Sequence, residues 1–313
     1  MPPIRVGILG LSATSSWAVQ AHLPYLISSP KYIIAGVCNS SRESSQKAID
    51  AHSLKDAKPY SFPTDLAASS EIDLVVCAVR VDRHYNALKP AIAAAASIYR
   101  LDGPETREGS EYLNFKELGG NMLVIPFGHL YDSVSYVLGE LQYVSATLST
   151  QFPDVAVKSS AGKIVDTIKR TTADQISMSG LLASGAHSSA VVHGSGPFKG
   201  EPALVWRIEG DKGIIELRGE TAFAVSMSGQ VKIRLQDFAS GEVKNIDFEG
   251  GTSGPPENIG RLYEAFADGK DYPDWKWAVK RHAWVDALYE SHERGKRASY
   301  AGSHGDQSVP SSL

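Results

Sequence analysis

Short β-branched runs alternate with helical patterns over the first hundred residues, and this alternation restricts the fold more than any other feature. It is typical of a parallel sheet wrapped by helices. The predicted strands are Ile4–Leu9, Tyr32–Cys38 and Ile72–Val79, with weaker ones at Tyr60–Phe62 and Ser97–Tyr99. The predicted helices are Trp17–Ser28, Ser41–Ala51 and Arg83–Ala96. The three main strands are apolar on both faces, as expected when helices cover each side of the sheet.

The pattern changes after Gly119, where a helical stretch runs to about Leu138 and many alternating segments follow. These segments are Val144–Thr150, Gln175–Leu182, Ser188–His193, Leu204–Glu209, Gly213–Arg218, Ala222–Ser226, Val231–Leu235 and Val243–Phe248. Turn signals separate several of them, so we predict a largely antiparallel sheet. Helices at Glu257–Ala267 and Trp275–Arg294 follow, and the Ser-, Gly- and Pro-rich segment 302–313 is expected to be a flexible tail.

The charge balance and apolar runs exclude several classes of protein. The 313 residues hold 31 Lys and Arg against 35 Asp and Glu, which leaves no basic footprint for nucleic acid. The longest apolar stretches, Leu74–Val79 and Ala91–Ala96, are far shorter than a membrane span of roughly 20 residues. Cys38 and Cys77 fall in predicted strands, so we expect buried reduced thiols in a cytoplasmic protein, with no disulfide and no metal site.

The turn after the first strand has part of a dinucleotide-binding pattern. Such a loop follows the pattern G-x-G-x-x-G and holds the pyrophosphate on backbone N–H groups and a helix N-terminus. Here Gly10 keeps the first glycine, whereas Ser12 and Ser15 occupy the other two positions. Serine can donate to phosphate, although its Cβ limits the approach of the backbone. The alternative is an ordinary strand-to-helix turn with a serine cap.

The end of the second strand indicates which dinucleotide the chain would bind. Proteins that bind NAD usually carry Asp or Glu there for the ribose hydroxyls. This chain has Asn39, Ser40, Ser41 and Arg42, and a neutral side chain followed by hydroxyls and a guanidinium suits a 2′-phosphate. The pattern therefore favours NADP over NAD. Alternatively, Ser40 or Ser41 only caps the next helix.

Several segments together resemble the Gfo/Idh/MocA oxidoreductase family, in particular its fungal branch, which includes the yeast galactose-gene repressor. The N-terminal ones are Arg5–Ser12, Ala35–Ser41 and Asp73–His84; the later ones are Gly119–Asp132, Asn258–Phe266 and Trp277–His282. The resemblance implies an incomplete Rossmann-type sheet over 1–110, followed by an α+β domain over 111–301 with a large, mostly antiparallel open sheet.

The resemblance also implies ligands and partners. A nicotinamide cofactor is expected, with Arg80 and His84 beside its ribose and nicotinamide. A small-molecule substrate is expected as well, and homo-oligomers would form through the open sheet. If the site has been remodelled, the cofactor could be absent.

One departure from the family is large. Its members continue from the helix at Arg83–Ala96 into a strand that carries the catalytic Lys, but here Arg100–Gly109 follows and the approach to the second-domain motif begins at once. We therefore predict an internal deletion that removes the catalytic Lys segment. His129 matches the family's active-site histidine, yet the position four residues earlier, usually Asp, is Ile125. His129 is either a site residue or a histidine that faces the core.

Three functions follow from these observations. The first is an NADP-linked oxidoreductase that acts on a sugar-like or secondary-metabolite alcohol or carbonyl, with His129 in proton transfer. The second is a non-redox enzyme of fungal secondary metabolism, which orients a substrate for cyclisation, elimination or isomerisation. The third is an NADP-binding regulator that binds a protein partner. Fold alone does not decide among them.

Overall fold

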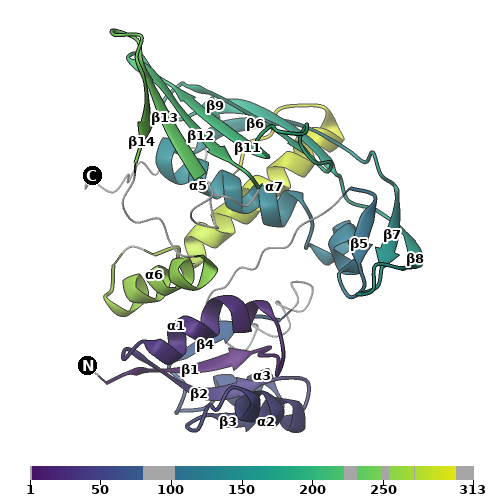
Figure 1. Cartoon of the computed structure of the whole chain (residues 1–313), viewed down its shortest axis with the longest axis vertical. Coiled ribbons are helices and arrows are strands. Elements are labelled where there is room, and N and C mark those ends of the chain that lie inside the picture. The colour runs from purple at the N-terminus through teal and green to yellow at the C-terminus, as the bar shows by residue number, and fades with distance from the viewer. Residues whose placement is uncertain (1, 80–102, 222–230, 248–253, 271, 301–313) are drawn as a thin grey trace. The chain divides into compact units, whose positions relative to one another are not determined.

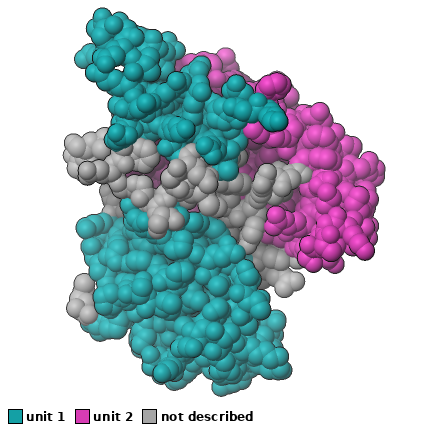
Figure 2. All heavy atoms as spheres, in the orientation of Figure 1, with its two compact units in different colours: residues 1–97, 199–272 teal, residues 98–198, 273–313 magenta. Residues whose placement is uncertain are grey.

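A computed structural model describes residues 2–79, 103–221, 231–247, 254–270 and 272–300. The chain divides into two compact units, each built from two separate stretches of sequence (Figures 1 and 2). The first unit consists of Met1–Ser97 and Lys199–Tyr272, and the second consists of Ile98–Phe198 and Pro273–Leu313. The predicted boundaries at 110 and 301 stay a prediction.

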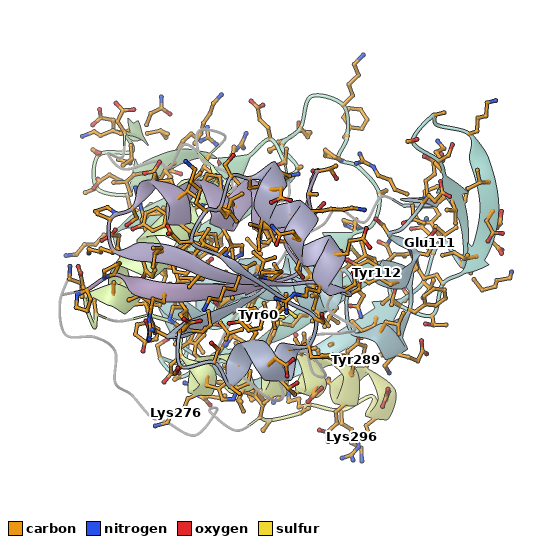
Figure 3. All side chains as sticks on the ribbon, turned by 90° about the horizontal axis from the view of Figure 1, so that it is seen from below. Tyr60, Glu111, Tyr112, Lys276, Tyr289 and Lys296 are labelled. Atoms are coloured by element: carbon orange, nitrogen blue, oxygen red, sulfur yellow. The ribbon has the colours of Figure 1, made fainter. Side chains whose placement is uncertain are left out.

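The N-terminal part of the first unit is a four-stranded parallel sheet in the order β3-β2-β1-β4. Its strands are β1 Ile4–Leu9, β2 Tyr32–Cys38, β3 Lys58–Tyr60 and β4 Leu74–Cys77. This is the first part of the Rossmann order, which confirms the predicted fold class. Tyr60, labelled in Figure 3, lies on the edge strand β3. The sheet buries Val6 and Ile8 completely, together with the unpaired thiol Cys77.

The connecting helices are η1 Ala18–His22, α1 Leu23–Ser28, α2 Arg42–Ala51 and α3 Pro63–Ala67. The first of them, η1, is a π-helical turn in which the N–H of Leu23 bonds to the carbonyl of Ala18. Pro24 follows immediately and has no N–H to continue the regular pattern, which favours this wider turn. The predicted helix Trp17–Ser28 is thus a π turn joined to a short α-helix.

A helix from late in the sequence, α6 Pro255–Ala267, packs against α1 and η1. The Tyr263 ring stacks on Tyr25, with ring centroids 5.9 Å apart, and the Tyr32 hydroxyl donates to the Tyr263 carbonyl. Lys31 forms ion pairs with Glu264 and, at 2.6 Å, with Asp268. Residues more than 230 positions apart thus complete one hydrophobic core.

The first unit also holds a four-stranded antiparallel sheet, β11 Leu204–Glu209, β12 Gly213–Gly219, β13 Val231–Asp237 and β14 Val243–Ile246. Glu216 on β12 faces Arg207 on β11 and Arg234 on β13, and it also pairs with Arg218. The hydrogen bonds from these guanidiniums, that of Arg234 foremost, lower the pKa of Glu216 to about 2. Because Arg207, Glu216 and Arg234 lie directly opposite one another, these ion pairs favour the observed register of β11, β12 and β13.

The second unit holds a sheet in the order β10-β9-β6, formed by β6 Leu141–Ser149, β9 Gln175–Leu182 and β10 His187–His193. A smaller sheet contains β5 Glu105–Arg107, β7 Asp154–Lys158 and β8 Ile164–Lys169. Its helical elements are η3 Glu111–Asn114, η4 Lys116–Leu118, η5 Leu123–Phe127, α5 Gly128–Leu138 and α7 Trp275–Arg294. In the core of the unit, the buried Trp284 of α7 stacks on Tyr131 of α5 at 4.8 Å.

A buried ion pair between Arg170 and Asp174 lies in the connection from β8 to β9, which belong to the two different sheets of the second unit. The Arg170 guanidinium donates to Asp174 Oδ2 at 2.7 Å, to the Gly103 carbonyl at 2.7 Å and twice to Asn114 Oδ1. Asp174 also accepts from the backbone N–H groups of Gln151 and Phe152, both at 2.8 Å. Every polar group of the pair is thus satisfied, as a buried charge requires.

No helix in the part of the chain that the structure describes is long and apolar enough to cross a membrane. The predicted elements Arg83–Ala96, Ser97–Tyr99 and Ala222–Ser226 lie outside the described residues.

Candidate functional site

The turn between β1 and η1 requires glycine at its first position. Gly10 has φ +88°, and a Cβ there would lie 2.8 Å from Val79 Cγ1 and 2.9 Å from the Val79 backbone nitrogen. Its N–H donates to the Cys38 carbonyl at 3.0 Å. The predicted first glycine of the loop therefore lies where the chain passes close over the carboxyl ends of β2 and β4, the edge at which such sheets bind ligands.

Beyond Gly10, the loop leaves backbone donors free. Among the described residues, the N–H groups of Ser12, Ala13 and Ser15 have no hydrogen-bond partner, whereas the Thr14 N–H donates to Ser12 Oγ at 3.1 Å. Ser12 is partly exposed, and residues 13–15 are exposed. Free N–H groups between a strand and a helix attract anions, so the turn fits a dinucleotide pyrophosphate.

The two loop serines use their hydroxyls locally. Ser12 Oγ accepts from Thr14, and Ser15 Oγ accepts from the Gln20 amide at 3.1 Å. Neither hydroxyl is buried. For an anion, this loop offers mainly its backbone N–H groups, and the two serine hydroxyls are additional donors.

The segment after β2 divides into a capping part and an exposed part. Ser41 is the N-cap of α2. Its hydroxyl accepts from the Ser44 N–H at 3.1 Å, and Ser44 Oγ in turn accepts from the Ser41 N–H at 3.1 Å. Ser40 and Arg42 are exposed, and no described residue forms a hydrogen bond or ion pair with either side chain. A guanidinium and a hydroxyl are therefore available beside the N-terminus of α2.

Asn39 faces the protein rather than solvent. Its amide nitrogen donates to the carbonyls of Leu11 at 2.8 Å and Ser44 at 3.1 Å, while its Oδ1 accepts from no described residue. His52, just after α2, donates from Nε2 to the Ser12 carbonyl at 2.8 Å. Sequence reasoning missed His52 because nothing in the spacing of residues 12 and 52 indicates a contact between them.

His129 lies in the first turn of α5 and is half-buried. Burial lowers the pKa of its imidazole, and no described side chain forms a hydrogen bond with it. Ile125, four residues earlier, is buried, so no carboxylate stands at the position where the family has one. Asp132 accepts from Trp277 Nε1 at 2.7 Å and thereby links α5 to α7.

The turn before His129 is also irregular. The N–H of Phe127 bonds to the carbonyl of Met122, five residues earlier, because Pro126 lies within this turn and lacks an N–H. Single π turns of this kind often occur at functional sites. Arg80 and His84, expected beside the cofactor, lie outside the described residues.

The family model of the Gal80p C-terminal domain matches residues 86–219. Among curated proteins, the dehydrogenase aclE of Aspergillus oryzae is 25% identical, and the match covers 95% of this chain and 98% of that protein. The galactose/lactose metabolism regulatory protein GAL80 of Kluyveromyces lactis is also 25% identical, over 71% of this chain and 65% of its own length.

The aclE alignment has a further property. It extends over 366 positions, but 95% of 313 residues is only about 297, so roughly 70 aligned positions have no counterpart in this chain. That difference is in keeping with the predicted internal deletion.

Two solved structures show the fold. The super-repressor mutant of Gal80p from Saccharomyces cerevisiae has a TM-score of 0.83 at 20% identity, covering 97% of this chain and 99% of that one. An NAD binding oxidoreductase from Klebsiella pneumoniae has a TM-score of 0.71 at 13% identity, covering 96% and 100%. Residues 86–219 are therefore similar to the Gal80p C-terminal domain, the chain is similar in sequence to Gal80 and to a fungal dehydrogenase, and its fold matches that of the Gfo/Idh/MocA oxidoreductases.

Proposed function

We propose that this chain binds a nicotinamide dinucleotide at the turn of residues 10–17 and acts as an oxidoreductase-like protein on a small alcohol or carbonyl compound. The N–H groups of Ser12, Ala13 and Ser15, which have no partner among the described residues, support the proposal, because free donors at the carboxyl edge of a parallel sheet attract anions. The relationship to a fungal dehydrogenase supports it.

NADP is the proposed dinucleotide. Arg42 begins α2 with an exposed guanidinium, Ser40 adds an exposed hydroxyl, and neither side chain pairs with any residue that the structure describes. No carboxylate stands at position 39. A 2′-phosphate would gain a charge-assisted hydrogen bond there, whereas the ribose hydroxyls of NAD would lack the usual carboxylate acceptor. Arg42→Ala is therefore expected to weaken NADPH binding about tenfold and to leave NADH binding unchanged.

His129 is the proposed proton-transfer residue. A bound nicotinamide supplies hydride transfer, and the hydroxyl of an alcohol substrate must lose a proton in the same reaction. Because burial lowers its pKa, His129 is neutral at pH 7 and can accept that proton at a ring nitrogen. No described carboxylate orients the ring, so we expect slow turnover compared with an enzyme that has the complete relay.

The test is a fluorescence titration of the 313-residue protein with NADPH and with NADH. Saturable NADPH binding is expected, and no binding of either dinucleotide would overturn the proposal. Alcohol and carbonyl substrates are then screened for a change in nicotinamide absorbance. His129→Phe should abolish that change, whereas His187→Phe, which alters an exposed histidine on β10, should not. Product formed without any absorbance change would support the non-redox enzyme instead.

A regulator that binds a protein partner is the second candidate. The family model that matches residues 86–219 describes a domain of Gal80p, and a relative from Kluyveromyces lactis is a regulatory protein. The isolated imidazole of His129 also agrees with a fold that keeps nucleotide binding without efficient chemistry. Recovery of one defined partner in affinity purification, dependent on added NADPH and without turnover, would favour this function.

We also propose that the chain forms homo-oligomers through the β11–β14 sheet. The register places Ile208, Ile215, Leu235 and Ile246 on one face, and Ile215 and Ile246 are 43% and 39% exposed. Sedimentation velocity tests this assembly. The wild-type chain should sediment as an oligomer, and Ile215→Lys should shift it toward the monomer because a charge on that face opposes burial.

A further inference from the structure

We infer that Asn39 and His52 are positioning residues, which hold the turn of residues 10–17 in the shape that presents its N–H groups to a phosphate. The inference rests on the proposed dinucleotide binding and deepens it, because it assigns to two side chains outside the turn the control of how well the turn binds an anion. Neither residue is expected to contact the dinucleotide through the nitrogen that braces the turn.

Asn39 braces the first carbonyl of the turn. Its amide nitrogen has two protons, and both are used, one on the Leu11 carbonyl at 2.8 Å and one on the Ser44 carbonyl at 3.1 Å. The backbone N–H of Asn39 donates to Ser45 Oγ at 2.8 Å, and Ser45 is completely buried. The side chain therefore connects Leu11 to the first turn of α2 and has no free donor for a ligand.

His52 braces the second carbonyl. Its Nε2 lies 2.8 Å from the Ser12 carbonyl, and because a carbonyl only accepts, Nε2 must carry the proton. His52 directly follows α2, whereas Ser44 lies in the first turn of the same helix. The helix therefore holds the turn from both of its ends.

These two contacts set the direction of the free donors. In a trans peptide, a carbonyl and the following N–H point in opposite directions. With the carbonyls of Leu11 and Ser12 held toward α2, the N–H groups of Ser12 and Ala13 point away from it. Both are among the backbone donors of the turn that have no partner among the described residues. The donors are thus oriented before a ligand arrives, which reduces the entropic cost of binding.

The test measures dissociation constants of NADPH and NADH for the whole chain and its variants. His52→Leu and Asn39→Ala are each expected to weaken the binding of both dinucleotides about five- to tenfold, because each removes one hydrogen bond to the turn. The ratio of the two constants should stay at the wild-type value because the pyrophosphate is common to both ligands. His52→Gln keeps a donor of similar reach and should recover most of the affinity. Arg42→Ala, in contrast, should change the ratio.

Gln46→Ala is the matched control. Gln46 donates to Asp50 on the exposed side of α2 and does not touch the turn, so its loss should leave both constants unchanged. If the wild-type protein binds the dinucleotides and His52→Leu and Asn39→Ala bind them with the same affinity, the positioning role alone is overturned. Absence of binding by the wild-type chain would overturn the proposed function and this inference with it. If His52→Leu does not fold, failure of a folded His52→Gln to bind like wild type is the refuting result.

Discussion

Replacing Gly10 by alanine tests the geometry of the turn most directly. Its φ of +88° is a conformation that L-residues avoid, at a cost of about 1–2 kcal/mol. The added Cβ would also lie 2.9 Å from the Val79 nitrogen and 3.0 Å from the Ala78 carbonyl carbon, and these backbone atoms, which directly follow β4, cannot rotate away as a flexible side chain can. Such overpacking costs roughly 1–3 kcal/mol. We expect Gly10→Ala to lower the free energy of unfolding by about 2–5 kcal/mol.

A second glycine of the same unit separates the two contributions. Gly200 has φ +91°, and nothing lies within 4 Å of the Cβ that an alanine would add. Gly200→Ala should therefore show only the conformational cost of about 1–2 kcal/mol. The difference between the two variants measures the close approach of the turn to β4.

The free energy of unfolding of both variants is measured by urea denaturation, with tryptophan fluorescence as the signal. NADPH binding is then measured by titration under native conditions. Gly10→Ala should also weaken NADPH binding at least tenfold, because the turn must move to accommodate the methyl group. Gly200→Ala should bind like wild type. Equal destabilisation by the two substitutions, or unchanged binding by Gly10→Ala, would contradict the reasoning.

Three further predictions concern stability. Arg170→Met leaves the buried Asp174 carboxylate without its guanidinium and should cost about 3–5 kcal/mol in chemical denaturation, whereas Lys169→Met, which removes an exposed pair, should change little. Burial lowers the pKa of His22 to about 4, so the unfolded chain takes up a proton that the native chain refuses. Stability should fall by up to ~3 kcal/mol from pH 6.5 to pH 4, and His22→Leu should remove that slope in calorimetry. Ser41→Ala should lower the melting temperature through loss of about 1 kcal/mol of capping free energy; an unshifted melting curve would contradict the cap.

Strands with a strong apolar pattern were predictable to the residue. β1, β2, β9, β11 and helix α7 have the bounds that their patterns indicated, since burial and periodicity agree there. The hairpin β7–β8 was missed. Strand β7, Asp154–Lys158, is short. Strand β8 is exposed at nearly every position, so no alternation of buried and exposed residues marks it as a strand. The two π turns were missed as well, because a proline signals an interruption without specifying its form.

The candidate site was predictable only in part. Gly10 was identified because a strand followed by a glycine is a local signal, and the structure places it at the turn with positive φ. Roles that depend on tertiary contacts could not be predicted from the sequence. Asn39 was predicted as a cofactor-binding residue in a segment that suits a 2′-phosphate, and the sequence did not indicate that its amide donates to the Leu11 carbonyl. Nothing in the sequence indicated the contact of His52. Ser41 has the capping role that was one of two alternatives.

The packing of α6 against α1 and η1 has a consequence for biosynthesis. Lys31 leaves the ribosome 237 residues before its partner Asp268. At 5–20 residues per second, roughly 10–50 s pass between the synthesis of α1 and that of α6, which packs against it. During that interval Tyr25, Tyr32 and His22 lack the Tyr263 surface against which they pack. The N-terminal unit must therefore finish folding after most of the chain has been translated, and shielding by chaperones during elongation would matter more for it than for a contiguous Rossmann domain.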